Sequence, residues 1–109
     1  MEDIKQKEIY EIYLPKNEKI ISNALAEEFI KSKFTITETA IIFVLICFIG
    51  DKNNKYNLIE LSYSDFEKIT QIDKHYIIKA VKPLIDKGII IKKQIYRKNY
   101  WGIADKYRI

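Results

Sequence analysis

The sequence predicts an α+β fold that is mostly α, in which a series of helices leads to a C-terminal β-hairpin. Residues 74–87 show a two-faced helical pattern, capping residues precede three of the expected helices, and two β-prone segments follow Gly88. The 109 residues are 48% hydrophobic, so one domain can bury a core without disulfide bonds. Cys47 is the only cysteine, and its place in an apolar run predicts a small buried side chain.

The first two helices are expected over residues 19–33 and from Thr35 onward. In the first, apolar residues recur near helical spacing, among them Leu25, Phe29 and Ile30. Thr35 followed by Glu38 is a capping box, which places a helix start there. Residues 40–49 are apolar on nearly every side, so they predict the buried centre of the domain, and Gly50 is expected to end this helix.

The next segments predict a short strand and two closely linked helices. Residues 56–61 are strand-like, and Ser62 with Asp65 forms a second capping box that opens a helix. Residues 70–72 make a tight connection, after which Asp73 caps a helix that Gly88 closes. This last helix places Ile77, Ala80, Val81, Leu84 and Ile85 on one arc, and His75, Lys79, Lys82 and Asp86 on the other.

The C-terminal hairpin is expected to join residues 89–97 and 101–109. A short polar turn at Lys98 and Asn99 separates the two strands, and alternation in the second strand gives one apolar face. Tyr96, Tyr100 and Trp101 would either stack on a ligand or pack the hairpin, and packing is the commoner role of aromatics there.

The N-terminal segment, residues 1–18, is expected to lie outside the main domain of residues 19–109. Ile9, Ile12, Tyr13 and Leu14 make it apolar, and Pro15 stops any regular element. It predicts a strand or arm that packs on a second subunit and forms a homodimer. The alternative is that the segment braces the core of its own chain.

Enzyme and membrane classes are disfavoured by what the sequence contains. His75 is the only histidine, the three glycines are far apart, and the carboxylates show no catalytic spacing, so no catalytic residue, cofactor or metal site is predicted. The apolar run 40–49 has about half of the roughly 20 residues that a bilayer span needs. The acidic start, Met-Glu-Asp-Ile-Lys, does not resemble a signal peptide, so a cytoplasmic protein is expected.

Positive charge is concentrated in the C-terminal half. Residues 1–61 carry a net charge of −2 and residues 62–109 a net charge of +6. The segment from Lys74 to Lys98 contains eight basic residues and a single acidic residue, Asp86. Such a local positive field predicts binding to a polyanion, most commonly nucleic acid, although a lysine-rich solvated surface would give the same count.

Two stretches resemble the centre of winged helix-turn-helix domains. Residues 61–70, Leu-Ser-Tyr-Ser-Asp-Phe-Glu-Lys-Ile-Thr, are similar to the strand and supporting helix of that family. Residues 73–90 are similar to its recognition helix, including the habitual ending in a charged turn, Lys-Gly and an aliphatic pair. The resemblance spans roughly residues 19–109 and implies binding to double-stranded DNA.

Within this fold, residues 17–25 and the Phe-Thr-Ile-Thr-Glu of residues 34–38 resemble the DNA-binding domains of phage and plasmid replication initiators. Multiple-antibiotic-resistance-type repressors share the same core, so a transcriptional repressor is the alternative. A further alternative is an interaction module of a mobile element that binds a replication or host protein.

The predicted DNA-binding residues fall into two groups. On the recognition helix, side chains near the N-terminus would reach base edges in the major groove, and Ile78 would either meet a thymine methyl or pack in the core. On the hairpin, basic side chains would contact phosphates and set affinity rather than sequence preference. The helix group comprises Lys74, His75, Tyr76, Ile78, Lys79 and Lys82, and the hairpin group Lys92, Lys93, Arg97 and Lys98.

Overall fold

The structure is a computed structural model that describes residues 21–49 and 57–108. The described elements, in chain order, are α2 (Asn23–Ser32), α3 (Ile36–Ile49), β1 (Ile59–Glu60), α4 (Tyr63–Thr70), α5 (Lys74–Asp86), β2 (Ile90–Ile95), β3 (Lys98–Ile103) and the 3-10 turn η1 (Asp105–Tyr107). This order confirms the predicted α+β fold with a C-terminal hairpin. The N-terminal arm of residues 1–18, its boundary at residue 19, the Gly50 cap and the turn after it lie outside the described residues.

α2 is shorter than predicted. It begins at Asn23, because Ser22 has an extended backbone and its Oγ accepts a hydrogen bond from the Leu25 backbone N at 3.1 Å. Leu25 is buried and Phe29 partly buried, whereas Ile30 is exposed on the other side of the helix. The inward-facing assignment of Ile30 was therefore wrong.

α3 begins as its capping box predicts. The Glu38 backbone N donates to Thr35 Oγ1 at 3.1 Å, and the Thr35 backbone N donates to Glu38 Oε1 at 3.0 Å. The helix is not buried on every side, however. Ile41, Ile42, Val44 and Leu45 face the core, whereas Phe43, Cys47 and Phe48 are exposed. The expectation that Cys47 is buried was wrong, because the helix packs on α4, α5 and β3 with one face only.

α4 and α5 form the predicted helix-turn-helix, and each cap has its expected partner. Ser62 and Asp65 make a reciprocal capping box, and hydrogen bonds from Ser62 lower the pKa of the Asp65 carboxyl below its usual range. Gln71 ends α4 in the left-handed region at φ 61°, and Asp73 Oδ1 accepts from the His75 backbone N at 2.8 Å. Gly88, at φ 72°, closes α5 in a Schellman motif, with Ile89 N bonded to the Leu84 carbonyl.

The sheet has the order β1-β3-β2, with both neighbouring pairs antiparallel. In the hairpin, Ile90 pairs with Ile103 and Ile95 with Lys98. The turn is therefore Tyr96–Arg97, two residues earlier than the predicted Lys98–Asn99. Gly102 has no room for a side chain, since a Cβ there would lie 2.7 Å from the Asn57 carbonyl oxygen beside β1.

The second strand also ends early, at Ile103 rather than near the C-terminus. The chain then turns through η1 and contacts α2, where Ser22 Oγ donates to the Tyr107 carbonyl at 2.6 Å. Tyr107 Oη donates to Glu28 Oε1 at 3.2 Å. These bonds join the first described helix to the last described turn.

The core lies between α3, α4, α5 and the inner face of the sheet, and Trp101 is at its centre. Trp101 is completely buried, with its ring edge-on to Phe66 at 5.3 Å between centroids. Its Nε1 donates to the Leu61 carbonyl at 2.7 Å. The packing role preferred for Trp101 is confirmed.

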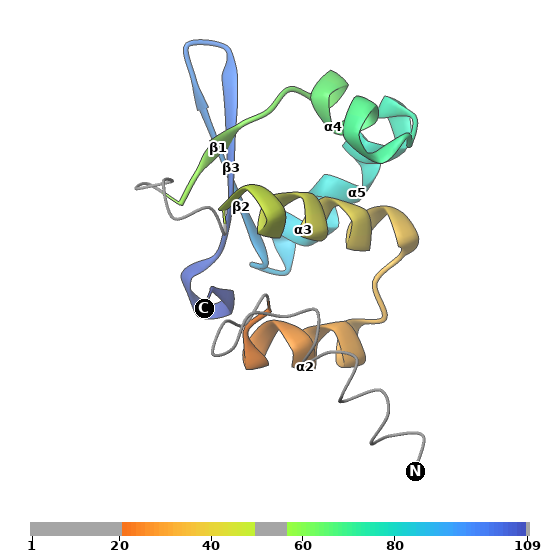
Figure 1. Cartoon of the computed structure of the whole chain (residues 1–109), viewed down its shortest axis with the longest axis vertical. Coiled ribbons are helices and arrows are strands. Elements are labelled where there is room, and N and C mark those ends of the chain that lie inside the picture. The colour runs from red at the N-terminus through yellow and green to blue at the C-terminus, as the bar shows by residue number, and fades with distance from the viewer. Residues whose placement is uncertain (1–20, 50–56, 109) are drawn as a thin grey trace, which may run out of the picture.

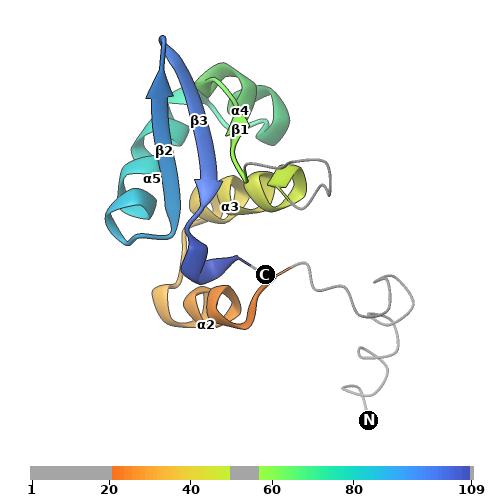
Figure 2. The same cartoon turned by 90° about the vertical axis from the view of Figure 1, so that its left-hand side faces the viewer.

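The two ends of the domain are formed by different elements. Figure 1 shows α4 and the hairpin tip at the upper end and α2 with the C-terminal turn at the lower end. Figure 2, turned by 90°, shows the same separation, with the hairpin rising beyond the body of the domain. None of the helices in residues 21–49 and 57–108 has the length and apolar character to cross a bilayer.

Candidate nucleic-acid interface

The outward face of α5 is exposed and carries most of the predicted helix residues. Ile77, Ala80, Val81 and Leu84 pack into the core, which directs His75, Ile78, Lys79 and Lys82 to solvent. Ile78 is 46% exposed, so it belongs to this outward face and not to the core. Four adjacent side chains thus present two ammonium groups, an imidazole and an aliphatic group, of the kinds that contact base edges.

Three further side chains lie beside the outward face of α5. Tyr76 is 59% exposed, and its ring meets the His75 ring edge-on at 5.9 Å between centroids. The Lys74 backbone N donates to Glu67 Oε2 at 2.6 Å, which fixes the start of α5 against α4 and leaves the exposed Lys74 side chain at that end. Ile85, predicted on the buried arc, is partly exposed on the opposite flank, which corrects that assignment.

The hairpin, which we call the wing (residues 90–103), has two faces with different surroundings. Since Lys93 pairs with Tyr100 and Ile95 with Lys98, these side chains share the outer face. Glu60 of β1 pairs with Tyr100 and reaches Lys98, whose Nζ lies 3.7 Å from Glu60 Oε1. Both partners are half-exposed, so this ion pair is weak, and Lys98 keeps access to solvent.

Lys92 lies on the inner face of the wing, opposite Trp101. Its Nζ donates to Tyr63 Oη at 2.9 Å and lies over the Tyr63 ring at 5.2 Å and the Trp101 ring at 5.4 Å. The structure therefore separates Lys92 from the other predicted wing residues and makes it part of the wing's packing on α4. Strand alternation from the buried Ile90 is the signal that could have placed it there.

The tip of the wing is formed by Tyr96 and Arg97. Both have positive φ, 48° and 67°, which in a two-residue hairpin turn is the type I′ conformation. Tyr96 is 94% exposed, so the packing role expected for it was wrong. Two non-glycine residues in this region cost conformational energy, and such outliers often mark functional positions. An aromatic ring and a guanidinium therefore stand at the most projecting point of the wing.

Replacing the tip by the residues that a type I′ turn prefers should stabilise the domain. We expect Tyr96→Asn with Arg97→Gly to raise the free energy of unfolding by about 1 to 2 kcal/mol, because asparagine and glycine adopt positive φ at low cost. Urea unfolding followed by circular dichroism measures it. A lower stability than the parent would show that the tyrosine or arginine side chain contributes more than its backbone costs.

Together, α5 and the wing offer two projecting elements of matching charge. α5 has 13 residues and is about 20 Å long, and a major groove about 12 Å wide admits such a helix. Lys93, Arg97 and Lys98 project from the wing on exposed side chains. Both elements thus expose basic side chains, of types that contact base edges and phosphates in nucleic-acid complexes.

The chain matches none of the known protein-family models. Among curated proteins it is similar to the chaperone protein DnaK of Mesomycoplasma hyopneumoniae (strain 232), at 36% identity over 84 residues. That match covers 75% of this chain and 13% of the chaperone. The chain thus spans only a small part of the length of that relative, so the match gives no basis for assigning the chaperone's activity to this chain.

Among solved structures the chain is similar to the adhesin competence repressor AdcR from Streptococcus pyogenes, with a TM-score of 0.52. The match covers 94% of this chain and 63% of AdcR, at 16% identity. At this identity the similarity shows the fold alone. It agrees with the element order, the helix-turn-helix and the hairpin described above, and the chain therefore has a winged helix-turn-helix fold.

Proposed function

We propose that this protein binds double-stranded DNA through α5 and the wing. The observation that carries the proposal is the outward face of α5, where His75, Ile78, Lys79 and Lys82 are exposed while the opposite face is buried. A helix held in this way by its neighbour α4 can enter the major groove without rearrangement. The basic wing would add phosphate contacts, which strengthen binding and fix its register.

We further propose a transcriptional repressor as the biological role. The fold similarity is to a protein named as a repressor, and neither protein described above is a replication initiator. The replication role expected from the sequence thus gains no support. An isolated domain of this kind reads few base pairs, so two copies are expected on one operator, joined through the N-terminal segment.

Selection of bound duplexes from a random DNA pool tests DNA binding directly. We expect one enriched motif, and an inverted repeat if two copies bind. Placed between a promoter and a reporter gene, that motif should lower expression when the protein is present. A pool without enrichment at low salt would overturn the proposal and favour a protein-interaction module that uses the same face of α5.

Replacing Lys79 should change the DNA sequence preference of the protein much more than its folding stability. Lys79→Ala removes an exposed side chain from the centre of the outward face, so the melting temperature should stay nearly unchanged. Discrimination at one base pair should fall by about 1 to 3 kcal/mol, as measured by competition between the selected site and single-base variants. Lys31→Ala, an exposed lysine on α2 at the other end of the domain, is the matched control and should leave preference unchanged. Equal preference in both variants would mean that Lys79 does not read a base.

A further inference from the structure

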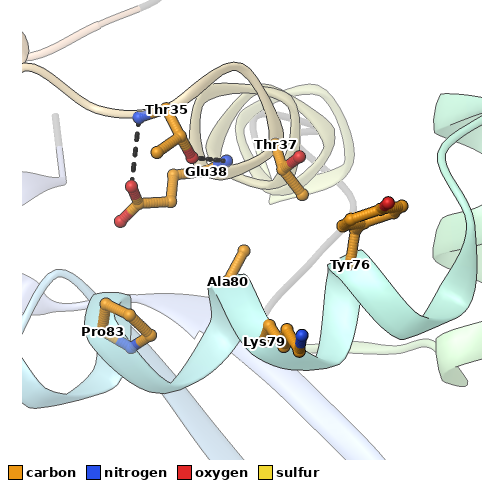
Figure 3. Close-up of a pocket in the computed structure, with 7 residues that line it drawn as sticks. All are labelled: Thr35, Thr37, Glu38, Tyr76, Lys79, Ala80 and Pro83. Atoms are coloured by element: carbon orange, nitrogen blue, oxygen red, sulfur yellow. Dashed lines mark hydrogen bonds between the residues drawn. The ribbon is translucent and has the colours of Figure 1, made fainter.

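A cleft lies between the N-terminal end of α3 and the side of α5 that carries Tyr76. Its volume is about 280 Å³, close to the lower end of about 300 Å³ for small-molecule pockets. Figure 3 shows the two helices on either side of it, with Thr35 just before α3, Thr37 and Glu38 in the first turn of α3, and Tyr76, Lys79, Ala80 and Pro83 on α5. Two of these residues, Tyr76 and Lys79, also belong to the proposed DNA-binding surface.

Glu38 gives this cleft a specific chemistry. The residue is only 7% exposed, and its Oε1 accepts the Thr35 backbone hydrogen bond of the capping box at 3.0 Å. Its Oε2 is buried and has no hydrogen-bond partner among the described residues. Figure 3 shows this carboxylate projecting from α3 into the space above Ala80 and Pro83. A buried carboxylate oxygen without a donor is costly, and a donor from a ligand would relieve that cost.

The other walls indicate which donor fits. The Ala80 methyl group, the Pro83 ring and the Tyr76 ring make an apolar floor, and Thr37 adds a hydroxyl at the edge. The ammonium of Lys79 points away from Glu38 in Figure 3, and no ion pair joins these two residues. The Thr35 backbone N already donates to Glu38 Oε1, and the Glu38 backbone N to Thr35 Oγ1, so only Oε2 of this carboxylate is left without a donor among the described residues. The vacant feature is therefore an acceptor, and it calls for a cationic donor on an apolar body.

We propose that this cleft is a binding site for a small primary amine with a ring-sized apolar body. The ammonium group donates to Glu38 Oε2, and the ring lies on Ala80 and Pro83 beside Tyr76. Binding at this place also lowers DNA affinity, because the ligand then contacts Tyr76 and Lys79, which also belong to the proposed DNA-binding surface. This second step rests on the proposed function, whereas the amine site itself does not.

The size of the coupling follows from linkage. A ligand that binds only the DNA-free protein weakens DNA binding by the factor 1 + [ligand]/Kd. An amine at ten times its dissociation constant should thus weaken DNA binding about 11-fold.

The amine site is tested first without DNA, on the full chain, by amide NMR titration. Benzylamine is the probe, and benzyl alcohol and benzoate are its neutral and anionic counterparts. We expect saturable shifts at Thr37, Glu38, Tyr76 and Ala80 with benzylamine and at least tenfold weaker binding of the two counterparts. Comparable binding of benzyl alcohol or benzoate, or no saturation at these amides, would overturn the site.

Glu38→Gln provides the matched variant. Glutamine can retain the capping box, so the start of α3 should be preserved while the charge is lost. We expect benzylamine to bind this variant at least tenfold more weakly, and Glu27→Gln, an exposed carboxylate on α2, to bind like the parent. Equal binding to the folded Glu38→Gln protein would also overturn the site. If that variant fails to fold, the comparison of the three probes on the parent still decides the question.

DNA titrations with the selected duplex then test the coupling, with sodium chloride added at equal ionic strength as the control. We expect benzylamine to weaken binding by the parent and to have no effect on binding by Glu38→Gln. Amine binding with unchanged DNA affinity would overturn the regulatory step and leave the site intact. Amine binding by a protein that binds no duplex would overturn the proposed function and with it the regulatory step.

Discussion

Replacing Trp101 by alanine should lower the free energy of unfolding by about 3 to 5 kcal/mol. The indole is completely buried, edge-on to Phe66 at 5.3 Å and to Tyr63 at 5.7 Å. Its removal leaves a cavity, and the Leu61 carbonyl loses the donor that lies 2.7 Å away. Because a domain of this size is stable by only about 5 to 15 kcal/mol, the variant should lose a large part of its stability.

Urea unfolding of the parent and of two companion variants checks this expectation. Tyr100→Ala changes the adjacent residue on the outer face of the wing and should cost less than about 1 kcal/mol. Trp101→Phe keeps an aromatic ring but loses the indole donor, so its cost should fall between those of the other two. A Trp101→Ala protein as stable as Tyr100→Ala would mean that the core does not depend on this ring.

The parts of the fold that the sequence predicts best are those determined by local interactions. Thr35 with Glu38, Ser62 with Asp65, and Asp73 each lie within three residues of the groups they cap. Gly88 closes α5 because the end of the helix requires a positive φ at this position, which glycine adopts without steric cost. Such signals are complete within one turn of helix, and no knowledge of tertiary structure is needed to recognise them.

The hairpin turn could not be predicted in this way. Lys98–Asn99 is the more polar pair, and asparagine is a common turn residue, whereas Tyr96–Arg97 has no residue that favours positive φ. The observed register places Trp101 opposite Lys92 and over Phe66, in the core. Burial of that ring outweighs the backbone cost at the tip, so a tertiary contact decides a local structure.

For the candidate interface, the sequence predicts which side chains α5 exposes better than it predicts the surroundings of the wing side chains. Helical periodicity is sufficient to place His75, Lys79 and Lys82 on one face of α5. Strand alternation from Ile90 gives the inward direction of Lys92, but the partner of its ammonium, Tyr63, is 29 residues earlier in the chain. The cleft at Glu38 likewise depends on the approach of α3 to α5, and a capping-box glutamate gives no local sign of it.

Removing the exposed charges of the wing should produce the largest change in DNA binding. In the triple variant Lys93→Ala, Arg97→Ala, Lys98→Ala, three expected phosphate contacts are lost. The slope of log affinity against log salt should then become shallower by about 2.7, from about 0.9 per contact. Over a fourfold increase in salt, the parent should lose about 40-fold more affinity than the variant. Fluorescence anisotropy with the selected duplex and with an unrelated duplex measures both slopes.

The control for this experiment changes the same net charge at the opposite end of the domain. Lys31, Lys33 and Lys106 are exposed on and around α2 and η1, so their replacement by alanine should leave the slope within about 0.5 of the parent's. Since phosphate contacts are independent of sequence, the wing variant should weaken both duplexes alike, in contrast to Lys79→Ala, which should affect the selected site alone. Lys92→Ala separates the effect of packing from the effect of charge, because the Lys92 ammonium contacts Tyr63 and Trp101. This variant should lower the free energy of unfolding and change the salt slope only slightly. Equal slopes for the wing variant and the control would mean that the wing does not contact DNA, and α5 would then have to supply the affinity by itself.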